Sequence, residues 1–402
     1  MLKKIINISK VFTFDQQSKN IKCIENPEIL IKNGKILELS STVANCDNII
    51  DANNCIVTPG FIDSHTHPIF IGNRAKDFVS RLNGKTYKQI NNEGGGILSS
   101  IELLRNATDD ELFLSSLKNI KSFIDLGTTT IEAKSGYGLT TEDEIRSLEI
   151  IKKINSCLPI DIIPTFLGAH SVPPEYSKSD YINIICNEMI PEIGRRKLAV
   201  FCDVFCEEGY FNKKDSCKIL NQAKNYGLIP RLHADEFVYS GGAELAKEIK
   251  AASADHLMAI NNDGIEALAS SDVIATLLPG TTFFLNQDNY VNGRKLIDSG
   301  CNIALASDFN PGTCTIQSLS KIMQLAVMKC NISLDEAFKG VTINAAKSLL
   351  KQDSVGVIEK GYKADILFWD IDSLEEIIYW DNSSNLRLKK VIKNGQIIST
   401  SV

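Results

Sequence analysis

The chain has 402 residues, 44% of them hydrophobic and 23% charged, and its formal net charge is −6. This composition is ordinary for a soluble globular enzyme, and the mild, interspersed charge gives no reason to expect nucleic acid or an anionic membrane surface as a partner. No run of about 18 apolar residues occurs, so no membrane span is expected. The eleven cysteines are scattered without any Cys-x-x-Cys pair, which predicts buried free thiols in a reducing cytoplasm.

The first 58 residues are predicted to form short β-strands. Residues 1–10 carry charge but have no long apolar core and no small-residue cleavage site, so we interpret them as a strand and not as a signal peptide. Apolar residues flank Asn33-Gly34, a pair that favours a type I′ turn, and this pattern predicts a β-hairpin over residues 29–37.

The centre of the chain alternates strand and helix patterns. Eight strands are predicted, over residues 61–66, 128–133, 160–167, 201–206, 229–233, 252–255, 273–278 and 303–307. Helices are predicted between them, over residues 111–126, 142–155, 179–190, 215–226, 242–250 and 317–329. This alternation predicts an α/β fold, a (β/α)8 TIM-like barrel of parallel strands. The first crossover is long, about 60 residues, and such an insertion usually lies over the active-site mouth.

The C-terminal end repeats the pattern of the N-terminal end. A strand is predicted over residues 364–369, and a second hairpin over residues 391–398, around Asn394-Gly395. Because both ends are β-rich and the middle is not, the simplest arrangement is one small β-sandwich domain built from both termini. The predicted domains are the barrel, residues 59–350, and the β-sandwich, residues 1–58 and 351–402.

Only five histidines occur, and each lies near the end of a predicted strand: His65, His67, His170, His233 and His256. Asp308 follows the apolar run at residues 303–307. Alternate side chains of a strand share a face, so His65 and His67 both reach one ion, while His233 and Asp308 end other strands at the same mouth. A single histidine on an apolar strand is more often a packed core residue. Five at the strand ends of one barrel predict a centre for a divalent catalytic metal.

Several further segments are distinctive: Pro59–His67, Arg74, Glu93–Ile97, Lys134–Leu139, Phe166–His170, Asp203–Glu207, His233–Glu236 and Ser307–Thr313. Together they resemble the imidazolonepropionase family of the amidohydrolase superfamily, over essentially the whole chain. The His-x-His motif alone marks only the superfamily. The combination of Lys-Ser-Gly-Tyr-Gly with Asp-Phe-Asn-Pro-Gly-Thr is far more specific.

The resemblance implies a mononuclear metal site with zinc or iron bound by His65, His67, His233 and Asp308. It also implies a homodimer and a set of residues that contact substrate or product, namely Arg74, Tyr137, His170, Glu236, Asn310, Gly312 and Thr313. The implied reaction belongs to histidine degradation: 4-imidazolone-5-propanoate, a small molecule, is hydrolysed to N-formimidoyl-L-glutamate.

Such a reaction needs proton transfer, and Glu236, three residues after His233, is the candidate general base and acid, with a surface loop carboxylate as the alternative. His256 is predicted either to steady the developing oxyanion or to orient the water, or to act without direct contact. His170 is predicted to contact the substrate ring. Arg74 and Tyr137 suit the propanoate, unless they are a solvated charge and a packed aromatic.

Three other functions compete with this interpretation. A binuclear amidohydrolase would need a carboxylated lysine on the fourth barrel strand, but residues 201–207 contain none, and Lys134 ends the second strand instead. A mononuclear deaminase could share His233 and Glu236, although Arg74 and Tyr137 favour an acidic substrate. A barrel that has become a binding protein typically lacks part of the metal set, which is complete here.

Overall fold

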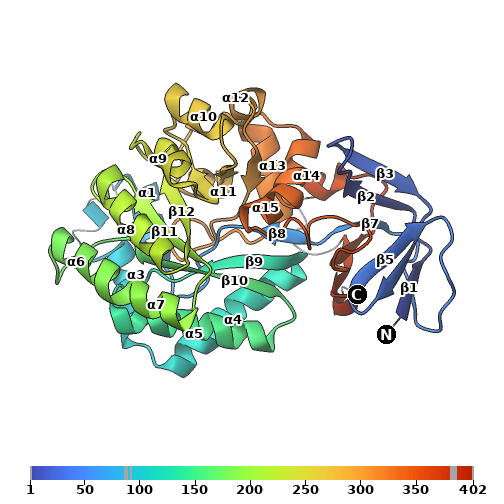
Figure 1. Cartoon of the computed structure of the whole chain (residues 1–402), viewed down its shortest axis with the longest axis horizontal. Helices are drawn as coiled ribbons and strands as arrows, with labels where there is room; N and C mark the ends of the chain where they lie inside the picture. The colour runs from blue at the N-terminus through green and yellow to red at the C-terminus, as the bar shows by residue number, and fades with distance from the viewer. Residues whose placement is uncertain (1, 86–88, 91–92, 381–386, 401–402) are drawn as a thin grey trace.

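The structure is a computed structural model that describes residues 2–85, 89–90, 93–380 and 387–400. Figure 1 shows a large α/β body and a small all-β body at one end, next to which both chain termini lie. The fold class predicted from the sequence, a barrel with a small β-sandwich built from both ends of the chain, is confirmed. Within the described ranges, every helix is too short or too polar to span a lipid bilayer.

Eight parallel strands form the large body, in the order of the sequence. They are β8 (Phe61–Asp63), β9 (Thr128–Lys134), β10 (Asp161–Ala169), β11 (Phe201–Cys206), β12 (Ile229–Ala234), β13 (Ser253–His256), β14 (Ile274–Leu277) and β15 (Ile303–Leu305). All eight predicted strands are present, with ends that differ by up to three residues. The first was predicted to continue to residue 66 but ends at Asp63. Beyond it, the carbonyl of Thr66 accepts from the N–H of Lys134 in β9 at 3.1 Å, and Thr66 also pairs with Phe309.

That pairing closes the barrel between its first and last strands. The backbone N–H of His67 donates to the carbonyl of Phe309 at 2.8 Å, and the N–H of Asp308 donates to the carbonyl of His65 at 3.0 Å. Two segments 242 residues apart in the chain, around residues 66 and 308, are therefore held side by side by backbone hydrogen bonds.

Helices surround the strands, and several of them begin at a residue whose side chain caps the helix. Thr108 and Glu111 form a capping box at the start of α4 (Asp109–Asp125), and Asn212 and Asp215 do so at α8 (Lys213–Asn225). The other predicted helices are α5 (Thr141–Cys157), α9 (Gly242–Ile249) and α13 (Leu319–Lys329). The helix predicted over residues 179–190 is α6 (Lys178–Ile184), a π-helical turn η1 (Ile185–Met189) and α7 (Ile190–Arg196).

Further helices were not predicted, because most are too short to show a helical period. They are α1 (Ala75–Leu82), α3 (Ile97–Asn106), α10 (Asn262–Ala269), α11 (Pro279–Phe284), α12 (Gly293–Asp298), α14 (Leu334–Gly340), α15 (Ile343–Ser348) and α16 (Glu376–Tyr379). Of these, α1 and α3 lie in the long first crossover. The N–H of Gly96 there donates to Asp77 of α1 at 2.7 Å, and the adjacent Ile97 lines the pocket at the barrel mouth.

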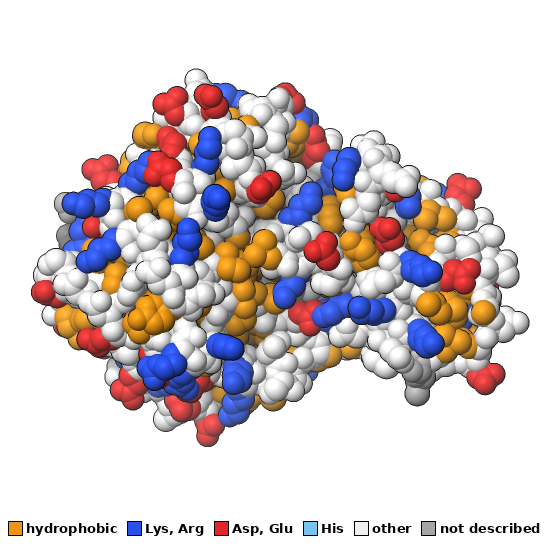
Figure 2. All heavy atoms as spheres, viewed as in Figure 1, with side chains coloured by type: hydrophobic (Ala, Val, Ile, Leu, Met, Phe, Trp, Pro, Cys, Tyr) orange, Lys and Arg blue, Asp and Glu red, His pale blue; other side chains and the backbone are white. Residues whose placement is uncertain are grey.

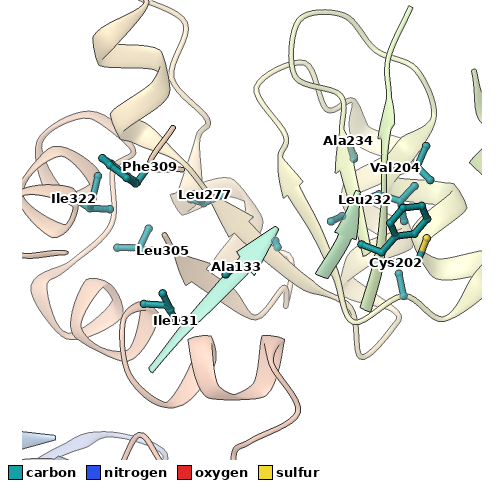
Figure 3. Packing of buried hydrophobic residues seen from close by; sticks show 14 of the residues in the cluster. Ile131, Ala133, Cys202, Val204, Leu232, Ala234, Leu277, Leu305, Phe309 and Ile322 are labelled. Carbon is teal, nitrogen blue, oxygen red and sulfur yellow. The ribbon is translucent and has the colours of Figure 1, made fainter. Parts of the chain in front are cut away.

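Barrel strands bury side chains on both faces, and the two faces differ in chemistry. Alternate positions are apolar and belong to one cluster with residues of the surrounding helices. Figure 3 shows several of them, including Ile131 and Ala133 of β9, Cys202 and Val204 of β11, and Leu232 and Ala234 of β12. The intervening positions of the same strands are charged or imidazole side chains, namely Glu132, Lys134, Asp203, Arg231 and His233, all buried. Strand alternation therefore turns these polar groups toward the barrel interior.

The small body consists of two sheets with the strand orders β5-β4-β1-β6 and β18-β17-β16-β7-β2-β3. Its strands are β1 (Leu2–Ile6), β2 (Lys10–Phe14), β3 (Ile21–Glu25), β4 (Glu28–Lys32), β5 (Lys35–Ser40), β6 (Ile49–Asp51), β7 (Ile56–Pro59), β16 (Ile366–Trp369), β17 (Leu388–Lys393) and β18 (Gln396–Thr400). Both predicted hairpins are confirmed, as β4–β5 and β17–β18. Ile5, Ile31, Ile366 and Ile392 are among the residues of its separate hydrophobic core.

The two bodies meet where β7 runs into β8. Trp369 of β16 packs on Phe61 with ring centroids 5.7 Å apart and donates to the hydroxyl of Thr58 at 2.8 Å. Lys393 of β17 and Lys363 each place their ammonium 2.7 Å from Asp161 of β10. The domain boundaries after residues 58 and 350 stay a prediction. On the face shown in Figure 2, acidic and basic side chains are interspersed.

Candidate metal and substrate site

A pocket opens at the carboxyl ends of the barrel strands. Its lining includes ten of the residues predicted for the site: His67, Arg74, Tyr137, His170, His233, Glu236, His256, Asp308, Asn310 and Thr313. His65 lies directly behind His67, since their Nε2 atoms are 3.2 Å apart. Gly312 packs under the guanidinium of Arg74. The structure thus brings the predicted residues to one place.

Four of these side chains converge on a common centre. Nε2 of His67 lies 3.2 Å from Nε2 of His65 and 3.4 Å from Nε2 of His233. Oδ1 of Asp308 lies 3.3 Å from Nε2 of His67 and 3.5 Å from Nε2 of His65. His65, His67 and His233 offer ligand atoms that lie within 4.8 Å of one another, and so do His65, His256 and Asp308.

Asp308 is held in place from its other side. Its Oδ2 accepts a hydrogen bond from the hydroxyl of Thr281 in α11 at 2.6 Å, which leaves Oδ1 for the imidazoles. Its backbone φ is 52°, and that of His256 is 83°, in the left-handed region that residues other than glycine seldom adopt. Backbone strain of this kind concentrates at functional sites, where the surrounding structure enforces it.

Two of the histidines are backed by carboxylates. Nδ1 of His65 lies 2.7 Å from Oδ2 of Asp255, and Nδ1 of His233 lies 3.0 Å from Oδ2 of Asp203. Burial lowers the pKa of His65 and of His67 well below the usual value, so both rings are neutral. With Nδ1 of His65 donating to a carboxylate, its Nε2 carries a lone pair directed at the centre.

This donor set fits a metal ion. Neutral imidazole nitrogens and a carboxylate oxygen that face one another repel, and a cation among them removes that repulsion. Ligands about 2.0–2.1 Å from a tetrahedral ion lie about 3.3 Å apart, which agrees with the separations of 3.2–3.5 Å observed among His65, His67, His233 and Asp308. Imidazole and carboxylate ligands without a thiolate favour a divalent ion of borderline or greater hardness.

Glu236 and His256 lie at the edge of this cluster. Oε2 of Glu236 is 3.6 Å from Nε2 of His256, and both side chains are buried. Burial, followed by the charges of Asp308 and Glu207, raises the pKa of Glu236 well above its ordinary value. Burial lowers the pKa of His256 to about 3, so this imidazole is neutral. Neither of its ring nitrogens has a hydrogen-bond partner among the described residues.

Aromatic rings form one wall of the pocket. His170 stacks on His67 with ring centroids 5.2 Å apart, and its Nδ1 donates to the carbonyl of Gly136 at 2.9 Å. Tyr137 lies 5.4 Å from His170, again between ring centroids. Phe205 contacts both His170 and His233, with centroid distances of 6.3 and 5.7 Å. The resulting wall suits a small planar ring as ligand.

The turn after Asp308 supports Arg74. Oδ1 of Asn310 accepts from the backbone N–H groups of Gly312 and Thr313 at 2.8 and 2.7 Å, and its Nδ2 donates to the carbonyl of Asp308 at 2.7 Å. The amide of Asn310 is therefore used inside the turn. The backbone N–H of Arg74 donates to the carbonyl of Pro311 at 3.0 Å, and the Arg74 Nε is buried without a partner among the described residues. An anionic ligand would supply the hydrogen-bond acceptor that this guanidinium Nε lacks.

Some members of the site were not predicted from the sequence. Asp255 and Arg231 had no assigned role, and neither did Phe205, Tyr210, Phe237 and Ile97, which also line the pocket. A signal for the first two was present, because charged residues inside strands expected to be buried require partners.

Comparison with known proteins agrees with this geometry. Residues 220–398 match the model of the amidohydrolase family. An imidazolonepropionase of Thermoanaerobacter pseudethanolicus is 44% identical over 386 residues, which cover 93% of each chain. An imidazolonepropionase of Clostridium tetani is 42% identical over 410 residues, covering 98% of this chain and 97% of that relative. Among solved structures, a guanine deaminase of C. acetobutylicum has a TM-score of 0.75 and 18% identity, and the match covers 99% of this chain and 100% of that one. At that identity the likeness concerns the fold alone.

Proposed function

The chain belongs to the imidazolonepropionase family of amidohydrolases, and we propose that His65, His67, His233 and Asp308 hold one zinc or iron ion at the barrel mouth. The activity is that of a hydrolase acting on a carbon–nitrogen bond of a cyclic amide. Its substrate is a small molecule, 4-imidazolone-5-propanoate, which is opened to N-formimidoyl-L-glutamate in histidine degradation. The convergence of four donor atoms at 3.2–3.5 Å carries the proposed site.

A bound divalent ion would lower the pKa of a water molecule and polarise the ring carbonyl. A single ion is favoured because no lysine of β11 is available to bridge two. Lys134, at the end of β9, is fully buried with its ammonium 2.7 Å from both Glu132 and Asp203. It is committed to those carboxylates and does not reach the centre as a ligand.

Glu236 is the proposed proton carrier. Its raised pKa makes the carboxylate a stronger base than an exposed glutamate, so it accepts the proton of the attacking water. The water oxygen adds to the ring carbonyl carbon, the carbon–nitrogen bond breaks, and Glu236 returns the proton to the leaving ring nitrogen. Neutral His256, 3.6 Å away, is placed to donate to the developing oxyanion or to orient the water.

Substrate binding is proposed to use the pocket wall and the turn. His170 and Tyr137 line the side on which the planar ring would lie. Arg74 offers to the propanoate an Nε that has no partner in the part of the chain that the structure describes. Asn310, Gly312 and Thr313 form the turn beneath Arg74. The Thr313 hydroxyl and the N–H groups of Gly312 and Thr313 hydrogen-bond to Asn310 within this turn, so we propose that it acts on substrate binding through the position of Arg74.

Glu236→Gln tests the proton transfer. The variant keeps its metal but loses turnover by about 10²- to 10⁴-fold, the range that general acid–base catalysis contributes. The assay follows loss of the ring chromophore of freshly generated imidazolone propanoate, with metal content measured on the same sample. Glu208→Gln, an exposed carboxylate on the loop after β11, is the matched control and keeps wild-type turnover.

Turnover close to wild type in the Glu236 variant, at full metal occupancy, would remove Glu236 from the mechanism. Ammonia is measured in parallel, because its release would indicate a deaminase instead of ring opening. A homodimer and a cytoplasmic location are further proposals from family membership. Light scattering and cell fractionation test them.

A further inference from the structure

A group of charged side chains lies on the inner face of the barrel strands, behind the cluster of histidines. All are completely buried: Glu132 and Lys134 on β9, Asp203 on β11, Arg231 on β12 and Asp255 on β13. The proton transfer described above uses none of them. Burying so many charges costs free energy unless each is paired and hydrogen-bonded, so their arrangement requires an explanation.

One pair stands behind His65. Oδ2 of Asp255 lies 2.7 Å from Nδ1 of His65 and accepts from Nη2 of Arg231 at 3.2 Å. The guanidinium is itself fixed, because it donates to the carbonyls of Ser64 and Ser348 at 2.8 and 2.9 Å. Ser64 directly precedes His65, so Arg231 holds both the backbone before this histidine and the carboxylate behind its ring.

A second pair stands behind His233. The ammonium of Lys134 lies 2.7 Å from Oδ2 of Asp203, and that oxygen lies 3.0 Å from Nδ1 of His233. Oδ1 of Asp203 also accepts from the backbone N–H of His233 at 3.1 Å. Lys134 is further tied to Glu132 at 2.7 Å, and Glu132 accepts from the N–H of Thr66, between His65 and His67, at 3.1 Å.

We propose that Arg231–Asp255 and Lys134–Asp203 are positioning pairs for two histidines. The first pair holds His65 as its Nδ1–H tautomer, with the Nε2 lone pair directed at the metal centre, and the second pair holds His233 through its backbone N–H. This inference rests on the proposed metal site. A carboxylate whose charge is compensated by a fixed cation is an acceptor for the ring N–H, which selects the tautomer and the ring orientation. The ring of His233 is held less directly, because its Nδ1 lies 3.0 Å from Asp203 without an aligned hydrogen bond. Nδ1 of His67 also has no hydrogen-bond partner among the described residues.

Replacing Asp255 tests the first pair. In Asp255→Ala the dissociation constant for zinc rises by about 10- to 100-fold, as is typical when the partner of a ligating histidine is lost. Asp255→Asn, which keeps an acceptor oxygen, gives a smaller rise. Affinity is measured by competition with a chromophoric chelator, starting from the zinc-loaded protein. The same protein, labelled with ¹⁵N in its five histidines, shows loss of the hydrogen-bonded Nδ1–H signal of His65 in the alanine variant.

The control is Asp365, another buried carboxylate paired with a lysine. It accepts from the ammonium of Lys393 at 2.7 Å and from the N–H of Asn394 at 2.8 Å, in the small β body. Asp365→Ala lowers thermal stability but leaves zinc affinity and the histidine signals unchanged, which separates positioning from general destabilisation.

Zinc affinity of Asp255→Ala within twofold of wild type, or a loss equal to that of Asp365→Ala, would overturn the positioning role. If the alanine variant does not fold, the asparagine variant decides by the same two measurements. Failure of the proposed function looks different, because then the wild-type protein itself binds no stoichiometric metal.

Discussion

Replacing Gly312 by alanine tests how the turn after Asp308 supports substrate binding. A Cβ atom at this position would overlap the guanidinium carbon, Nη2 and Nε of Arg74. The backbone of Gly312 is outside the left-handed region, so alanine itself adds no strain there. Because the backbone N–H of Arg74 is bonded to Pro311, the guanidinium is the part that moves, by more than about 1 Å to restore van der Waals separation.

A misplacement of about 1 Å in a positioning group costs about 10²-fold in kcat/KM, or about 3 kcal/mol of transition-state stabilisation. Since the propanoate is remote from the reacting bond, the loss falls mainly on KM. Initial rates are compared for the acid substrate and for an analogue without the carboxylate tail, in Gly312→Ala, Arg74→Ala and the double variant.

Gly312→Ala should have little further effect once Arg74 is alanine, because both changes remove the same interaction. Additive effects in the double variant would refute the reasoning, and so would equal losses with the analogue that lacks the tail.

Three other predictions concern pH, stability and metal. Burial, Asp308 and, after them, the charge of Glu207 raise the pKa of Glu236. In Glu207→Gln the acidic limb of the kcat/KM profile therefore moves to lower pH. A limb at the wild-type pH would contradict this contribution of Glu207. Burial opposes ionisation of Asp161, but Lys393 and Lys363 lower its pKa below the usual value. Asp161 therefore stabilises the fold above its unfolded pKa of about 3.9, and that contribution is lost as pH falls through its lower folded pKa. Asp161→Asn reduces the denaturation midpoint at pH 7 and makes stability less steep in acid; an unchanged midpoint contradicts the bridge. Removing the metal with a chelator abolishes ring opening and lowers the melting temperature, because an ion that binds only the native state stabilises it. About one equivalent of zinc or iron restores both activity and melting temperature. Recovery only at two equivalents contradicts a single ion.

The local pattern of the sequence was sufficient to predict the barrel strands and the segments that meet at the mouth of the barrel. Short apolar runs alternating with amphipathic helices determine a parallel barrel, and a parallel barrel brings the carboxyl ends of its strands to one rim. For that reason His65, His67, His233 and Asp308 could be grouped before any coordinates, although they are as much as 243 residues apart. Short helices such as α12 and α15 were missed, because six residues show no helical period.

The sequence by itself determined which residue types are gathered at the mouth, because each strand end is a local feature. Only the tertiary structure decided which of them touch. Arg231 meets Asp255 because β12 pairs with β13 in one particular register, and Lys134 reaches Asp203 across the barrel interior. Gly312 lies under Arg74 because Thr66 pairs with Phe309 and closes the barrel. Such contacts depend on strand register and ring closure, which are set by the packing of the whole core and not by any segment alone.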